Sequence, residues 1–247
     1  MPKKYQAEKI VPYQGKGSKT MQIEQMFDSI AHSYDQLNIT LSMGIDRLWR
    51  RNAMKTLRPY APAQILDVAT GTGDLAILEA RKLKPQRVTG IDLSEGMLAI
   101  GRQKVKAAGL DELVVMECQD CLNLQFADNS FDAITVAFGV RNFEDLEKGF
   151  AEMYRVLKPG GVLLVLELST PQRFPMKQLY NFYSATVIPF FGRMISKDRS
   201  AYDYLNKSVQ AVPQGEEMAS IFRNVGFRNV VFDRYTFGIC TNYRGEK

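Results

Sequence analysis

The stretch Ile65-Leu66-Asp67-Val68-Ala69-Thr70-Gly71-Thr72-Gly73-Asp74-Leu75 decides the fold of this chain. Residues 65–68 are mostly apolar and predict a short buried parallel strand. A glycine-rich turn follows, and residues 75–83 then have the pattern of a helix. A strand, a tight glycine turn and a helix open the nucleotide sites of doubly wound α/β proteins, because glycine lets the backbone approach a ligand closely. We therefore predict a nucleotide-cofactor site at this turn, with Gly71 and Gly73 against the ligand.

The carboxylates beside the turn indicate which nucleotide it binds. The spacing Gly71-x-Gly73-x-x-Ala76 also fits the dinucleotide fingerprint, with alanine at the third position. However, Asp67 precedes the turn and Asp74 follows it, and two carboxylates would repel a pyrophosphate. They would attract the sulfonium and ammonium groups of S-adenosylmethionine (SAM), so we favour SAM as the cofactor. The alternative, in which Asp67 caps the loop and Asp74 caps the helix, stays open.

Strands and helices alternate along the chain and predict a doubly wound α/β fold with a mostly parallel seven-stranded sheet. The expected strands are residues 65–68, 88–92, 113–118, 131–138, 162–168, 227–232 and 236–243, of which the last two are antiparallel. Residues 61–247 would form this domain, with a substrate-cap insertion near 172–215. Residues 21–60 would form an N-terminal helical cap, with helices at 21–31 and 45–57 and a polar loop at 32–38.

Charge and composition limit the classes of protein. The net charge is +5 and the isoelectric point is about 9.0, but residues 1–19 hold five lysines against one glutamate. This segment also has two prolines and two glycines and no apolar period, so we predict a mobile basic arm at residues 1–20. The remainder is nearly neutral, which argues against a dedicated nucleic-acid-binding protein.

Cysteine usage and hydropathy indicate the compartment. The chain has three cysteines and one histidine, whereas a zinc site usually needs four such ligands. We therefore predict that the Cys118-x-x-Cys121 spacing binds no metal. The odd number of cysteines, and the lack of a signal-peptide pattern and of a run of about 18 apolar residues, favour a cytoplasmic protein.

Polar side chains follow successive strands and predict the outline of the site. The carboxyl ends of parallel strands meet at one edge of the sheet, which brings the glycine turn together with Asp92, Asp120, Cys121 and the segment 138–142. Asp92 can accept hydrogen bonds from ribose hydroxyls. Asp120 and the backbone of Cys121 can contact the edge of adenine.

Several motifs resemble a known family. Val68-Ala69-Thr70-Gly71-Thr72-Gly73-Asp74 and Arg155-Val156-Leu157-Lys158-Pro159-Gly160-Gly161 resemble class I SAM-dependent methyltransferases. More specifically, Tyr34-Asp35-x-x-Asn38-x-x-x-Ser42-x-Gly44-x-x-Arg47-x-Trp49-Arg50 and Phe138-Gly139-Val140-Arg141-Asn142 resemble the menaquinone/ubiquinone-biosynthesis C-methyltransferase family. The resemblance covers about residues 22–245. It departs at Asp46, where the family usually has histidine, and we expect this position to be structural.

The resemblance implies a Rossmann-like fold, SAM as the cofactor and a polyprenylated quinol as the substrate. The implied reaction is C-methylation of the quinol ring, most simply demethylmenaquinol to menaquinol. By the same resemblance, the residues that match the family's SAM contacts are Thr72, Asp92, Asp120 and Cys121.

The chemistry of this reaction assigns roles to three further residues. Ring carbon becomes a strong nucleophile when an adjacent hydroxyl ionises, and Arg141 could stabilise the resulting phenolate. The guanidinium group of arginine stays protonated in proteins and cannot accept a proton, so Arg141 would act electrostatically and not as a base. Asn142 or Tyr34 would orient the ring. The alternative for Arg141 is a salt bridge that holds the cap.

Other functions and contacts stay open. A nicotinamide-dependent oxidoreductase could use the same glycine turn. A non-catalytic SAM-binding module is disfavoured, because the specific motifs lie outside the cofactor site. The segment 174–195 could line a pocket for an isoprenoid tail, rest on the inner face of a membrane, or simply pack as a cap helix. The sequence is also compatible with a homo-oligomer.

Overall fold

The computed structural model of the chain describes residues 4–13, 15, 17–187 and 199–247. A seven-stranded sheet has the strand order β3-β2-β1-β4-β5-β7-β6. The strands are β1 (Gln64–Val68), β2 (Arg87–Asp92), β3 (Val114–Cys118), β4 (Phe131–Ala137), β5 (Leu157–Leu168), β6 (Arg228–Tyr235) and β7 (Cys240–Glu246). β7 runs antiparallel to β5 and β6, and the other pairs are parallel. The predicted doubly wound, mostly parallel sheet is confirmed.

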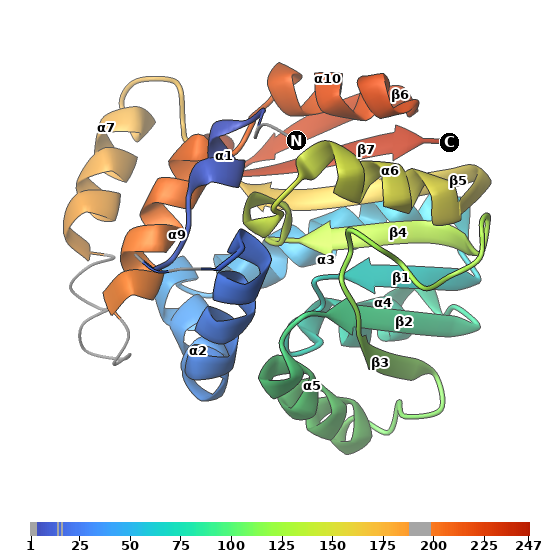
Figure 1. Cartoon of the computed structure of the whole chain (residues 1–247). Coiled ribbons are helices and arrows are strands. Elements are labelled where there is room, and N and C mark those ends of the chain that lie inside the picture. The colour runs from blue at the N-terminus through green and yellow to red at the C-terminus, as the bar shows by residue number, and fades with distance from the viewer. Residues whose placement is uncertain (1–3, 14, 16, 188–198) are drawn as a thin grey trace.

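Helices cover both faces of the sheet and its carboxyl edge (Figure 1). The helices are α1 (Gln6–Lys9), α2 (Lys19–Ser42), α3 (Ile45–Leu57), α4 (Asp74–Leu83), α5 (Glu95–Ala107), α6 (Leu146–Val156), α7 (Met176–Phe182), α9 (Arg199–Ala211) and α10 (Glu216–Val225). Short helical turns are η1 (Arg58–Tyr60), η2 (Val140–Asn142), η3 (Tyr183–Val187) and η4 (Thr236–Gly238). Figure 1 shows α2 and α9 beyond the tips of the parallel strands, where we expect a ligand site.

The strands are buried on both faces, so successive side chains enter different cores. Leu66 of β1 packs in a core with α6 and α10, whereas the preceding Ile65 packs in a core with α3, α4 and α5. In β5, Leu163 and Leu164 alternate between the two cores in the same way. This alternation explains why the central strands are almost continuously apolar.

The helical cap differs from the prediction at residues 32–38. These residues are helical and belong to α2, which is one continuous helix rather than a helix followed by a polar loop. The helix continues because Ile23, Met26, Ile30 and Leu37 keep one buried face along its length. It ends where Met43 adopts a left-handed φ of 51°.

The described part of the N-terminal segment is packed against the protein, which differs from the solvated arm expected from its composition. It contains the short helix α1, and Ala7 and Glu8 are buried. Lys19 is only 1 % exposed and donates from Nζ to the carbonyl oxygens of Ala7 (2.7 Å) and Arg141 (2.9 Å). Composition favoured a solvated arm, but hydrogen bonds to a distant loop hold this segment on the protein.

The insertion near 172–215 contributes α7, η3 and α9, and its role as a substrate cap stays a prediction. Residues 188–198, including Phe190 and Phe191 of the expected tail pocket, lie outside the described residues. In the described part of the chain, no helix is both long enough and apolar enough to cross a membrane.

Candidate active site

The glycine turn after β1 has a backbone that few residues can adopt. Ala69, Gly71 and Gly73 have φ values of 54°, 56° and 79°. A Cβ at Gly73 would also lie 3.2 Å from Cε of Met116, so this position favours glycine twice over. Phe138, at the end of the neighbouring β4, has a φ of 61°. Strained backbone at the ends of two adjacent strands is typical of a functional site.

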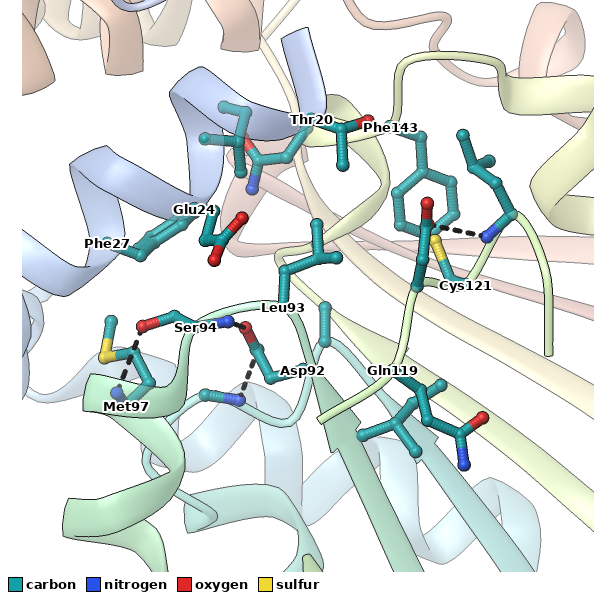
Figure 2. Close-up of a pocket in the computed structure, with 18 of the residues that line it drawn as sticks. Thr20, Glu24, Phe27, Asp92, Leu93, Ser94, Met97, Gln119, Cys121 and Phe143 are labelled. Atoms are coloured by element: carbon teal, nitrogen blue, oxygen red, sulfur yellow. Dashed lines mark hydrogen bonds between the residues drawn. The ribbon is translucent and has the colours of Figure 1, made fainter. Parts of the chain in front are cut away.

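A cavity of about 710 Å³ opens above this turn. Figure 2 shows side chains from α2, from the end of β2 and from residues 119–121 around it. Asp92 lines the cavity and accepts hydrogen bonds from the backbone N–H groups of Gly71 (2.8 Å) and Ser94 (3.0 Å). Burial raises the pKa of Asp92, and these N–H donors act against that rise.

The charge of this first cavity suits a cationic ligand. Its lining contains the carboxylates of Glu24, Asp92, Asp120 and Glu144, and no lysine or arginine among the described residues. A pyrophosphate there would meet four carboxylates and no cation, whereas a sulfonium and an ammonium would be attracted. The residues present therefore fit SAM and do not fit a dinucleotide.

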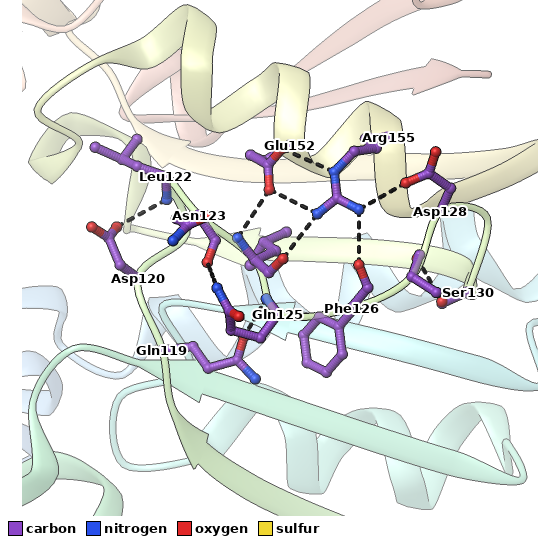
Figure 3. Close-up of polar contacts among 12 residues, drawn as sticks. Gln119, Asp120, Leu122, Asn123, Gln125, Phe126, Asp128, Ser130, Glu152 and Arg155 are labelled. Atoms are coloured by element: carbon purple, nitrogen blue, oxygen red, sulfur yellow. Dashed lines mark hydrogen bonds and ion pairs between the residues drawn. The ribbon is translucent and has the colours of Figure 1, made fainter.

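The loop that carries Asp120 and Cys121 is held from behind by α6 (Figure 3). Arg155 donates to the carbonyl oxygens of Leu124 (2.9 Å) and Phe126 (2.8 Å), and Glu152 accepts from the N–H of Leu124 (2.9 Å). These bonds fix the backbone of residues 119–126 without help from regular secondary structure. The side of the cavity formed by residues 119–122 therefore depends on a helix that does not line it.

The structure brings together four of the seven predicted cofactor residues. These four line the first cavity: Gly71, Asp92, Asp120 and Cys121. The other three, Asp67, Thr72 and Gly73, are not among its lining residues. The assignment of all seven as SAM contacts stays a prediction, and the last three would act through the shape of the turn.

Asp67 illustrates the difference between position in sequence and position in the site. Its side chain is 1 % exposed and accepts hydrogen bonds from Thr70 (2.6 Å) and Thr135 (3.3 Å) beneath the turn. Burial raises the pKa of Asp67 to about 7. Asp74 pairs with Lys104 (2.5 Å). The carboxylates that favour a cation are thus those of the cavity lining, and not the pair that flanks the turn in sequence.

Two aspartates, seven residues apart on α2, fix this helix as the roof of the cavity. Asp28 accepts from the hydroxyl of Ser94 (2.6 Å). Asp35 accepts from the hydroxyl of Thr72 (2.6 Å) and from Nζ of Lys104 (2.8 Å). The spacing of seven places both on one helix face, so α2 is attached at two points to α5 and the glycine turn.

A second cavity adjoins the first, and it is aromatic. It consists of two hollows of about 690 and 490 Å³ that share Tyr34, Asn38, Leu41, Arg141 and Leu205. The second cavity also contains Trp49, Tyr180, Tyr183 and Tyr204. The residues that line both the first and the second cavity are Phe27, Tyr34, Phe138 and Asn142. A group transferred between two ligands would pass this boundary.

All three predicted catalytic residues lie at or beside this boundary. Tyr34 lines every hollow of the two cavities, and burial raises its pKa further above the ordinary value of a phenol. Asn142 accepts from the hydroxyl of Tyr204 through Oδ1 (3.0 Å). Arg141 lines the second cavity only.

Arg141 makes a buried ion pair and also has a hydrogen-bond donor without a partner among the described residues. Its Nη1 donates to the carboxylate of Glu167 (2.7 Å) and to the carbonyl oxygen of Phe138. The side chains of Arg141 and Glu167 are 8 % and 2 % exposed. Nε of Arg141 is buried and has no hydrogen-bond partner among the described residues. A buried donor without a partner is costly unless a ligand satisfies it, so this geometry leaves room for both roles of Arg141.

Some lining residues gave no signal in the sequence. Glu24 and Phe27 enter the first cavity from α2, where their i, i+3 spacing is that of any amphipathic helix. Asp46 was expected to be only structural but lines the second cavity. His32 lies on α2 and is not among the lining residues of either cavity.

Comparison with known proteins agrees with this geometry. Residues 15–247 match the model of the ubiE/COQ5 methyltransferase family. Demethylmenaquinone methyltransferase from Bacteroides fragilis is 59 % identical over 98 % of this chain and 99 % of the relative. The enzyme of that name from Porphyromonas gingivalis is 50 % identical over 97 % and 98 %.

Solved structures with lower sequence identity share the fold. A SAM-dependent methyltransferase from Thermotoga maritima superposes with a TM-score of 0.64 at 21 % identity, covering 90 % of this chain and 99 % of that one. Phosphoethanolamine N-methyltransferase 2 from Haemonchus contortus, in complex with SAM, gives 0.65 at 17 % identity, covering 95 % and 61 %. The family match, the close relatives and the two adjoining cavities lead to one conclusion: the chain belongs to the ubiE/COQ5 methyltransferase family.

Proposed function

We propose that this protein is a SAM-dependent C-methyltransferase that converts demethylmenaquinol to menaquinol. Two close relatives named demethylmenaquinone methyltransferase match almost the entire chain, which supports this substrate. The observation that carries the proposal is the boundary between an acidic cavity and an aromatic one, formed by Phe27, Tyr34, Phe138 and Asn142. The nicotinamide alternative lacks support, since the described residues that line the first cavity offer no cation to a pyrophosphate.

The residues of the first cavity would hold SAM. Asp92 would accept the ribose hydroxyls, Asp120 and the backbone of Cys121 would contact adenine, and Gly71 would let the backbone approach. The acidic lining would favour the positive charges of the ligand. When bound, SAM supplies an electrophilic methyl group.

The residues of the second cavity would prepare the quinol ring. Arg141, through its unpaired Nε, would stabilise negative charge on a ring oxygen and so make the ring carbon more nucleophilic. Tyr34 and Asn142 would fix the ring at the boundary, which reduces the entropy that is lost in reaching the reactive orientation. The apolar and aromatic lining would exclude water from the ring.

The test uses methyl-labelled SAM and a panel of demethylated quinols. We expect label in the ring of demethylmenaquinol, identified by mass analysis of the product, and less label in a demethylated benzoquinol. The same panel in its oxidised quinone form is the control, because a quinone ring is a poor carbon nucleophile. Absence of labelled product from every quinol would reject the proposed function.

We further propose that the protein works at the cytoplasmic face of a membrane, where a polyprenylated quinol resides. Three apolar side chains in and before α7 are exposed: Phe174 (82 %), Leu179 (58 %) and Phe182 (68 %). Arg173 and Lys177, which alternate with them, are also exposed and would suit anionic headgroups. Free thiols at all three cysteines are compatible with a reducing compartment.

Membrane contact can be measured by sedimentation with vesicles that contain phosphatidylglycerol. We expect the double variant Phe174→Ser/Phe182→Ser to bind these vesicles at least tenfold more weakly. Phe237→Ser is the matched control, since Phe237 is 78 % exposed on η4, between β6 and β7. Equal vesicle binding by the wild-type protein, the double variant and Phe237→Ser would show that the membrane contact lies elsewhere on the protein.

A further inference from the structure

Asp46 is an acidic side chain in a cavity that is lined mainly by aromatic and aliphatic side chains. It lies in the first turn of α3 and is 6 % exposed. Its Oδ1 accepts from the hydroxyl of Ser42 (2.7 Å), and its Oδ2 pairs with Nη1 of Arg50. Among the described residues that line the second cavity, Asp46 is the only carboxylate. The ring-binding side of the site therefore has a single strong hydrogen-bond acceptor of this kind.

The acceptor at Asp46 has spare capacity. Each carboxylate oxygen can accept two hydrogen bonds, and the structure gives each oxygen one. Arg50 lies over the ring of Phe138 (5.2 Å from Cζ to the ring centroid), and its buried Nε has no partner among the described residues. Asp46, with spare acceptor capacity, and Arg50, with a buried donor that has no partner among the described residues, therefore line the same cavity, four positions apart in α3.

Within this pair, Asp46 matches a hydroxyl group and mismatches a carbonyl group. A quinol hydroxyl can donate to Asp46 and accept from Nε of Arg50. A quinone oxygen has no proton, so beside Asp46 it would set two acceptors against each other. Sites built to hydrogen-bond a substrate hydroxyl discriminate strongly against analogues that lack it, because buried polar groups are then left unpaired.

We infer that Asp46 accepts the hydrogen of a ring hydroxyl and thereby selects the reduced quinol over the oxidised quinone. The inference rests on the proposed function and deepens it, since only the reduced ring is a good carbon nucleophile. A membrane quinone pool contains both redox forms, and a quinone bound at the ring site would block turnover. Asp46 is thus a specificity-determining residue of the substrate cavity.

The test measures binding rather than turnover. Anaerobic titration calorimetry of the protein saturated with S-adenosylhomocysteine compares 1,4-naphthalenediol with 1,4-naphthoquinone. We expect the wild-type protein to bind the diol at least tenfold more tightly. The isosteric Asp46→Asn should lower this ratio by about 10-fold to 100-fold, because an amide can donate to a carbonyl oxygen and accepts less strongly from a hydroxyl.

Asp233→Asn is the matched control. It removes the same charge from another Asp–Arg pair, with Arg244 (3.5 Å) on the β6–β7 hairpin, and should keep the wild-type ratio. Equal affinities of the wild-type protein for the two probes, or no binding of the diol, would overturn the inference without any variant. A folded Asp46→Asn protein with the wild-type ratio would overturn it as well.

The labelled-SAM assay on wild-type protein separates this inference from the proposed function. If demethylmenaquinol is methylated but the two affinities are equal, the role of Asp46 fails and the function stands. If no quinol is methylated, the proposed function fails, while the ratio of the two affinities still decides whether Asp46 discriminates between a hydroxyl and a carbonyl group.

Discussion

Asp92 accepts hydrogen bonds from two backbone N–H groups at the edge of the first cavity, and it is one of the residues that line this cavity. Asp92→Ala removes a charged acceptor, which is worth about 1.5–3 kcal/mol. We expect SAM binding to weaken by about 10-fold to 100-fold, as measured by calorimetry. Asp111→Ala, an exposed carboxylate away from the cavity lining, should leave the affinity unchanged. Unchanged affinity in Asp92→Ala would remove Asp92 from the site.

Arg141 has two separable contributions, the ion pair with Glu167 and the unpaired Nε. Arg141→Lys keeps the charge and can keep the ion pair, but it loses the planar fork. We expect kcat to fall by about 100-fold or more, with little change in SAM affinity, as when one preorganised donor is removed. If the variant has a lower melting temperature but the same kcat as the wild-type protein, the role of Arg141 is structural.

Asp67 makes the stability depend on pH in an unusual direction. Burial raises its pKa from 3.8 to about 7, so between these values the folded protein binds more protons than the unfolded chain. The free energy of unfolding therefore falls as the pH rises through this range, by at most about 4 kcal/mol from this group.

Urea unfolding at pH 5 and at pH 8 measures this dependence. Asp67→Asn should reduce the loss of stability between these pH values, relative to the wild-type protein. The neighbouring buried carboxyl of Glu79, whose pKa is also raised by burial, is present in both proteins. Identical pH dependence in the two would show that Asp67 stays ionised in the folded state.

At the scale of elements, α6 positions a loop of the first cavity through Arg155. This side chain joins Glu152 of its own helix to two carbonyl oxygens and Asp128 of the loop. Arg155→Met removes these donors and keeps much of the stem. We expect SAM affinity to fall roughly tenfold, because the loop would need to be ordered on binding. Arg223→Met, which breaks a similar exposed pair with Glu216 in α10, should have no effect.

At the scale of the whole molecule, the N-terminal segment and the turn η2 stabilise each other through Lys19. Lys19→Met fills the same space but leaves the carbonyl oxygens of Ala7 and Arg141 without this donor. The two carbonyl oxygens keep the N–H of Ile10 (3.2 Å) and the hydroxyl of Tyr204 (3.5 Å), but each loses a hydrogen bond to a charged group, which is worth about 1.5–3 kcal/mol. We expect urea unfolding to show a loss of about 2–5 kcal/mol, together with a lower kcat. Lys9→Met, an exposed residue in the same segment, is the control and should show neither change.

The sequence by itself determined the sheet, the glycine turn and part of the first cavity. Apolar periods and glycine positions are local signals, and in a parallel sheet they also fix which loops meet. Gly71, Asp92, Asp120 and Cys121 could therefore be placed together without any knowledge of packing. The quinol chemistry came from the resemblance of motifs, and not from spacing.

Tertiary structure alone decided which charges reach a ligand. Asp67 and Asp74 flank the turn in sequence, yet one is buried beneath it and the other pairs with Lys104. Glu24 and Asp46 enter the cavities from the helical cap, which lies over the sheet through contacts distant in sequence. The physical reason is that burial and partner choice depend on long-range packing, whereas sequence patterns report only the periodicity of each element.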